Sequence, residues 1–168
     1  SVSVSCVGGV PDTTPSAWSN DVFGHGTHVA GIIAGAKNGI GIVGVAPSAK
    51  LGAIKVVDDN GLIMPEAFVC GLQWASDHGY DLVNASFTID PFAVYCANDA
   101  EQSTIVQVVR RAIASAARKR VTVVAATGNE FRDLSSQTGG AGNAHCVQLP
   151  VEIEGVIGVS AVGPTQSL

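Results

Sequence analysis

One histidine in this chain is placed as catalytic bases usually are. His25 lies between Gly24 and Gly26, and an apolar run at 29–36 that is typical of a helix follows it. The two glycines leave room for another backbone, such as that of a peptide substrate, to approach the imidazole. Because an imidazole can take a proton from a nucleophile near neutral pH, we predict that His25 is a general base. The alternative is a histidine that only satisfies local hydrogen bonds.

An asparagine could supply a second part of a catalytic site. The apolar run at 121–126 predicts a buried strand, and Thr127, Gly128 and Asn129 follow it directly. A side-chain amide at the end of a strand can point into a cleft and donate a hydrogen bond to a developing negative charge. The plainer interpretation is an asparagine that favours a turn.

The hydrophobic pattern predicts the elements that must position these side chains. Short apolar runs predict strands at 50–57, 82–87, 121–126 and 156–162. Helical patterns are expected from His25 onward, from Pro65 to the residue before Gly79, and at 103–120. Near-continuous apolar strands that alternate with helices predict an α/β fold of three layers. In that fold a mostly parallel sheet carries helices on both faces.

Polar residues follow three of the predicted strands, at 58–59, at 86–88 and at 127–130. The carboxyl ends of parallel strands meet at one edge of a sheet, and ligands of such sheets bind there. We therefore expect the site at this edge.

Charge and composition exclude several classes of partner. The net charge of −5 argues against nucleic acid, because binding to phosphates requires a basic surface. There is no uninterrupted apolar run of about 18 residues, so no membrane-spanning helix is expected. A length of 168 residues favours a single domain.

The four cysteines, Cys6, Cys70, Cys96 and Cys146, show no C-x-x-C spacing. They are therefore either free buried thiols or two disulfides, for which three connectivities exist. If the chain is secreted, we favour Cys96 with Cys146, since both fall in irregular polar loops after strand ends. Cys70 falls inside a predicted helix, so Cys6 and Cys70 either pair or stay free.

Three segments together resemble the subtilisin-like serine proteases, the subtilases. Gly24-His25-Gly26-Thr27-His28-Val29-Ala30-Gly31 resembles their histidine motif, and 123–130 is similar to their oxyanion segment, with Asn129 at the place of the donor asparagine. The segment 83–88 is similar to the strand edge to which an extended peptide substrate adds. The resemblance implies these substrate-binding residues: Ser86, Phe87, Thr88, Ala126, Thr127 and Gly128.

This chain departs from the subtilase pattern near the substrate. Phe87, Thr88 and Ile89 are bulkier than the glycines usual after the serine, and Thr127 stands where alanine is common. We therefore expect a first specificity pocket of altered depth and width.

The glycine-rich loop at 38–47 is similar to a subtilase loop that often coordinates calcium. On that resemblance the candidate ligands are Ala36, Asn38, Ile40 and Ile42. Calcium takes six to eight oxygens, so other residues would have to complete the site, and a metal-free loop is the alternative. His25 and His28 lack a third ligand at helical spacing, so zinc is not expected, and no organic cofactor is implied.

Two parts of the subtilase triad do not occur in this sequence. The Asp-Thr-Gly or Asp-Ser-Gly turn that normally precedes the histidine is missing, and neither Asp12 nor Asp21 lies in such a turn. The Gly-Thr-Ser motif of the nucleophile is missing as well. The resemblance therefore implies that residues 1–168 form one partial subtilase catalytic domain, incomplete at both ends. We expect the missing segments in companion chains or in a longer protein, and no triad cleavage by this chain alone.

The function implied by the resemblance is a secreted serine endopeptidase that acts on peptides or proteins. One alternative is a non-catalytic peptide-binding module, which the bulk of Phe87 and Thr88 favours. Another is a nucleotide-binding α/β domain, suggested by the twenty glycines. No Gly-x-Gly-x-x-Gly or Gly-x-x-x-x-Gly-Lys-Ser/Thr follows a strand, which argues against the nucleotide-binding domain.

Overall fold

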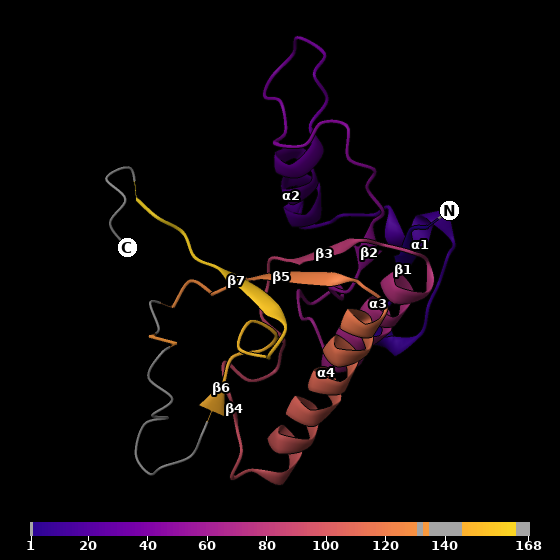
Figure 1. The fold of residues 1–168 in the computed structure, drawn as a ribbon. Coiled ribbons are helices and arrows are strands. Elements are labelled where there is room, and N and C mark those ends of the chain that lie inside the picture. Colours follow the sequence, from indigo (N-terminus) through magenta and orange to yellow (C-terminus); the bar gives the residue numbers. More distant parts are fainter. Residues whose placement is uncertain (1, 131–132, 135–145, 164–168) are drawn as a thin grey trace.

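A three-stranded parallel sheet forms the centre of the protein (Figure 1). The computed structural model describes residues 2–130, 133–134 and 146–163. The sheet has the order β3-β5-β7, with β3 at Leu82–Ala85, β5 at Thr122–Ala126 and β7 at Val156–Val159. Ala85 pairs with Ala125, and Ala126 pairs with Val159. This register brings the carboxyl ends of all three strands to one edge.

Two small sheets flank the central one. β1 (Val4–Ser5) pairs in parallel with β2 (Ile54–Lys55), and β4 (Tyr95–Cys96) pairs antiparallel with β6 (Cys146–Val147). A short 3-10 turn, η1 (Val7–Gly9), and helix α1 (Pro15–Trp18) follow β1.

Helices lie on both sides of the central strands, as the sequence predicts. Helices α3 (Pro65–Asp77) and α4 (Ala100–Arg118) pack against each other on one side, and α2 (His25–Ala34) lies on the other (Figure 1). Helix α3 begins at Pro65, a residue that suits the first turn of a helix. Helix α4 begins after Asp99, whose carboxylate accepts a hydrogen bond from the Gln102 N–H at 2.9 Å. Among the described residues, no helix has both the length and the apolar character needed to cross a membrane.

The buried core lies between the sheet and the pair α3 and α4. Leu72, Ile113 and Val123 are at most 2% exposed and belong to one apolar cluster. By contrast, no residue of α2 is buried, and Ile32 on that helix is 46% exposed.

Three predictions about strands were wrong in part. The strand expected at 156–162 ends at Val159. The strand expected at 50–57 is limited to Ile54–Lys55, because only these residues pair with β1. The strand expected to be buried at 82–87 ends at Ala85, and its Leu82 is 51% exposed. Side chains of a strand alternate between faces, so Ala85 reaches the core on the α3 and α4 side while Leu82 points away from it.

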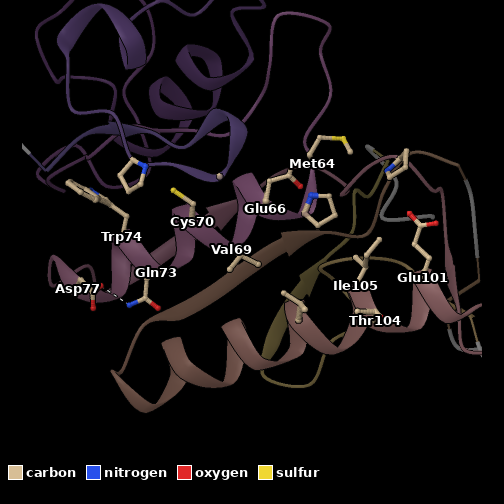
Figure 2. Close-up of a pocket in the computed structure, with 15 residues that line it drawn as sticks. Met64, Glu66, Val69, Cys70, Gln73, Trp74, Asp77, Glu101, Thr104 and Ile105 are labelled. Carbon is tan, nitrogen blue, oxygen red and sulfur yellow. Dashed lines mark hydrogen bonds between the residues drawn. The ribbon is translucent and has the colours of Figure 1, made fainter.

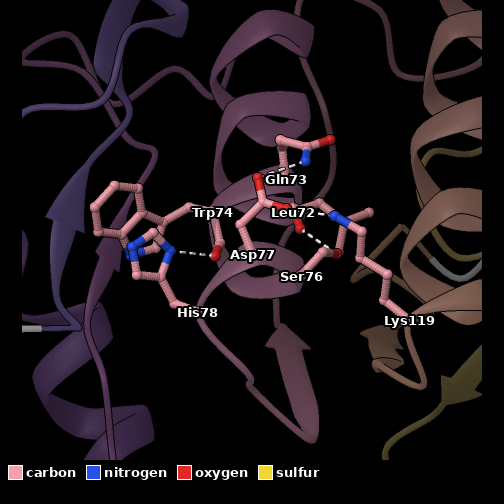
Figure 3. A network of polar contacts seen from close by, with 7 residues as sticks. All are labelled: Leu72, Gln73, Trp74, Ser76, Asp77, His78 and Lys119. Atoms are coloured by element: carbon pink, nitrogen blue, oxygen red, sulfur yellow. Dashed lines mark hydrogen bonds and ion pairs between the residues drawn. The ribbon is translucent and has the colours of Figure 1, made fainter.

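A polar network joins the ends of α3 and α4 (Figure 3). Asp77 forms an ion pair with Lys119 and accepts a hydrogen bond from the Gln73 Nε2 at 2.6 Å. The hydrogen bonds from Gln73 and Lys119 hold the pKa of Asp77 below its ordinary value. Next to it the His78 ring stacks on Trp74 at a centroid separation of 3.6 Å.

Two disulfides join segments that are distant in sequence. Cys96–Cys146 joins β4 to β6, which confirms the pairing favoured above. Cys6–Cys70 joins the segment after β1 to α3, so these two cysteines pair rather than stay free.

We predict that replacing Cys96 and Cys146 together by serine lowers the free energy of unfolding by about 2–4 kcal/mol. The disulfide restricts the unfolded chain, and its loss gives that chain more freedom. Denaturant unfolding of the double variant and the unchanged protein measures the difference. Equal stability, or a non-reducing peptide map that shows other pairings, would contradict this connectivity.

Candidate active site

The segments that follow β3 and β5 leave the sheet at the edge where the site was expected. Asn84 lies on β3 and donates from Nδ2 to the Ser86 Oγ at 2.8 Å, just beyond the end of the strand. Just after the neighbouring strand β5, the Thr127 N–H donates to the Val159 carbonyl at 3.0 Å, which ties the start of the predicted oxyanion segment to β7.

Asn129 is exposed and follows a glycine in the left-handed region. Gly128 has a φ of +93°, a conformation that side-chain-bearing residues rarely adopt. The Asn129 N–H donates to the Glu130 Oε2 at 3.0 Å. In the described part of the chain the Asn129 side-chain amide makes no hydrogen bond, so its donors are available to a ligand.

The predicted substrate segment 86–88 is half-buried, and hydrogen bonds fix the two residues that follow it. The Ile89 N–H donates to the Leu149 carbonyl at 3.0 Å, and the buried Tyr95 hydroxyl donates to the carbonyls of Ile89 and Asp90. Burial raises the pKa of Tyr95 to about 12, so this hydroxyl stays a donor at neutral pH. The Phe87 ring meets Phe68 edge to face at 6.2 Å and therefore packs against the core.

His25 is the first residue of α2, and Asp21 holds this end of the helix. The Asp21 Oδ2 accepts from the Thr27 N–H at 2.7 Å and from the Thr27 hydroxyl at 2.6 Å, while Oδ1 accepts from the Gly24 N–H at 3.1 Å. The hydrogen bonds from Thr27 are the main reason why the pKa of Asp21 lies below its ordinary value. Asp21 was not among the residues predicted from the sequence to act in the site. The signal that could have shown its role is an aspartate just before the predicted start of a helix.

The described residues do not assemble a triad around His25. The imidazole is exposed, and within the described ranges it makes no hydrogen bond to an acidic side chain or to Asn129. The Asp21 carboxylate is engaged by Thr27 and Gly24, so it does not take the place of the triad aspartate.

The loop expected to bind calcium is closed by its own hydrogen bonds. The Asn38 N–H donates to the Ala36 carbonyl at 3.0 Å, and the Asn38 Oδ1 accepts from the Ile40 N–H at 3.1 Å. Both oxygens keep a lone pair that a cation could use, and Ile42 is exposed in the same loop. Over the described ranges no group of three or more His, Cys, Asp or Glu side chains could hold a metal ion. Carbonyl-based calcium binding stays a prediction.

A separate groove of about 720 Å³ lies along α3 and α4 (Figure 2). Val69, Trp74 and Ile105 give it an apolar lining, and Glu66 and Glu101 add carboxylates. No residue predicted to bind substrate or to act in catalysis lines this groove, so we do not assign the active site to it.

The family of the chain follows from comparison with known proteins. The model of the subtilase family, Peptidase_S8, matches residues 1–168. The chain belongs to the subtilase family. Subtilisin DY of Bacillus licheniformis is 34% identical over 156 residues, which cover 93% of this chain and 49% of that protein. Subtilisin BL of Lederbergia lenta is 37% identical over 143 residues, which cover 85% of this chain and 46% of that protein.

Solved structures of two proteases show the same fold. The epidermin leader peptide processing serine protease of Staphylococcus aureus matches with a TM-score of 0.78 at 22% identity, over 99% of this chain and 42% of that one. The nisin leader peptidase of Lactococcus lactis matches with a TM-score of 0.71 at 22% identity, over 83% of this chain and 41% of that one. The predicted partial, subtilisin-like α/β fold is confirmed. The chain spans less than half the length of each of these four relatives.

We predict that the contribution of Asp21 to stability depends on pH. Its pKa is lowered on folding, so its stabilising effect is present above the ordinary value of 3.8 and is lost as pH falls through the folded pKa. Asp21→Asn should therefore reduce the free energy of unfolding at pH 6 and make a smaller difference near pH 3.

Asp59→Asn is the matched control for this measurement. Asp59 is exposed and makes no hydrogen bond among the described residues. A stability difference for Asp21→Asn that is the same at both pH values would contradict the role given to this carboxylate.

Proposed function

We propose that this chain is part of a serine endopeptidase, to which it supplies His25 as general base and Asn129 as oxyanion donor. Its membership of the subtilase family carries the proposal, because both residues stand in motifs of that family. The serine and the aspartate of the triad would come from segments outside residues 1–168.

The proposed reaction assigns one proton transfer to His25 and one stabilised charge to Asn129. His25 takes the proton of the serine hydroxyl as the serine oxygen attacks the peptide carbonyl, and it returns this proton to the leaving amine. The Asn129 amide donates a hydrogen bond to the oxyanion that forms at the carbonyl oxygen. The exposed imidazole and the unengaged Asn129 amide support these roles.

An extended peptide or protein chain is the proposed substrate. Among the described strands β3 pairs only with β5, so one edge of β3 and the segment 86–88 that follows it are available to pair with a peptide. We propose Ala126, Thr127 and Gly128 as the opposite wall, since they lead from the end of the neighbouring strand β5 to Asn129.

The structure weakens one argument for a non-catalytic peptide-binding module. That alternative was favoured because Phe87 and Thr88 are large side chains for a substrate cleft. Because the Phe87 ring packs against Phe68 and the core, its size does not by itself close the substrate site. The catalytic proposal is therefore preferred.

We also propose that the protein works outside the cell. Two disulfides in a chain of this size are typical of oxidising compartments.

The test of the catalytic proposal is the kinetics of peptide hydrolysis by the full-length protein. His25→Ala should reduce kcat by several orders of magnitude, on the order of 10⁶-fold, because the serine then has no base. Asn129→Leu should reduce kcat by about 10²–10³-fold with little change in KM, because the oxyanion loses one donor.

His78→Gln is the control, because His78 directly follows α3 and its ring stacks on Trp74 (Figure 3). It precedes β3, whereas the proposed substrate segment follows that strand. The variant should retain the activity of the unchanged protein. If His25→Ala were as active as this control, the assignment of the base would be wrong.

We further propose that the loop from Ala36 to Ile42 binds calcium, with Asn38 supplying its side-chain oxygen. A cation that binds only the folded state raises stability, by about 2.7 kcal/mol at a hundred times its Kd. Calcium should therefore raise the Tm of the protein and EDTA should lower it, while Asn38→Ala should reduce the calcium response. Asn60→Ala, in another exposed turn, is the control, and a Tm indifferent to calcium would exclude the site.

A further inference from the structure

The groove along α3 and α4 is acidic at the end where both helices begin. Glu66 and Glu101 lie in the first turns of the two helices, and both line the groove. Asp77 lies at the opposite end of the groove from Glu101 (Figure 2), where its ion pair with Lys119 neutralises its charge. This ion pair joins the last residues of the two helices, so α3 and α4 run in the same direction and their acidic starts lie together.

The later turns of α4 make the other end of the same face basic. Glu101, Thr104 and Val108 line the groove at helical spacing. Arg111 lies about one turn beyond Val108, and Arg118 lies about two turns beyond Arg111. Both arginines are exposed, so the exposed stripe of α4 changes from acidic to basic along its length.

The charges at both ends are available to a partner. All four side chains are exposed, and over the described ranges they form no ion pair: Glu66, Glu101, Arg111 and Arg118. Charged groups at the rim of an interface contribute to orientation and to the choice of partner.

An apolar strip lies between the charged ends. Val69 of α3 lines the groove together with Ile105 and Val108 of α4, and Val108 is 42% exposed. An exposed apolar patch that is bordered by polar and charged residues is typical of a protein–protein interface.

The order of the charges indicates which partner fits this face. A partner that is only basic or only acidic would be repelled at one of the two ends. A second copy of the chain carries both signs, and a two-fold axis that lies in the interface and crosses the helices reverses their direction. The acidic end of each copy then meets the basic end of the other, and the two apolar strips meet between them.

We propose that the face formed by α3 and α4 is the interface of a symmetric dimer of this chain. Glu101 of each copy faces the arginines Arg111 and Arg118 of the other, and the apolar strips around Val108 pack together. The apolar contact supplies affinity, and the charges fix the antiparallel direction. This inference goes beyond the proposed function and does not depend on it.

Sedimentation velocity of the full-length protein at concentrations up to about 100 μM tests the dimer. The unchanged protein should dimerise. Glu66→Lys combined with Glu101→Lys should raise the Kd of the dimer by about tenfold or more, because like charges then face each other. Arg111→Glu combined with Arg118→Glu should have the same effect. An equal mixture of the two variants should recover dimers, because each variant then carries the charges that the other lacks.

Lys37→Glu combined with Lys50→Glu is the matched control. It changes the net charge as much as the arginine variant does, and both lysines are exposed and lie outside the groove lining. This control should dimerise like the unchanged protein. If the unchanged protein is a monomer, if both charge-reversed variants keep the dimer, or if their mixture stays monomeric, the inference is wrong. Peptide hydrolysis by the unchanged protein tests the proposed function separately.

Discussion

The parallel pairing of β3, β5 and β7 is the constraint on which the rest of the structure depends. Its register places the ends of neighbouring strands together, so that residues about forty positions apart in sequence, Ser86 and Thr127, leave the sheet at one edge. The apolar contacts of Val123 with the core beneath α3 and α4 hold the central strand in place. The role proposed for Asn129 assumes this edge.

The second support of the site is covalent. The disulfide Cys96–Cys146 fixes the strand pair β4 and β6, and Gln148 follows β6 directly. Tyr95 on β4 in turn holds the carbonyls of Ile89 and Asp90. One small antiparallel pair therefore anchors the segment that carries Gln148 together with the segment that follows Ser86–Thr88. A helix on the opposite side of the sheet carries His25, and its start depends on Asp21.

The sequence predicted those helices and strands whose own residues carry the signal, as an apolar stripe or an apolar run. α3 and α4 have an apolar stripe and clear starting residues, and β5 is a continuous apolar run, so each was found. The limited extent of β2 was not predictable, because it depends on pairing with Val4–Ser5, about fifty residues away. The contact of Gln148 with Gly128 also arises only from the fold, and a single sequence carries no pattern for it. His25 and Asn129 were found through motifs, and their roles stay predictions.

The most direct test of the central claim is to treat the protein from its natural source with a fluorophosphonate, which labels activated serines, and to weigh the labelled chains. The account predicts a label on a chain that contains residues 1–168, or on a separate chain that copurifies with it. An unlabelled chain of residues 1–168 alone, without a labelled partner, would contradict the claim that this chain works in a serine protease.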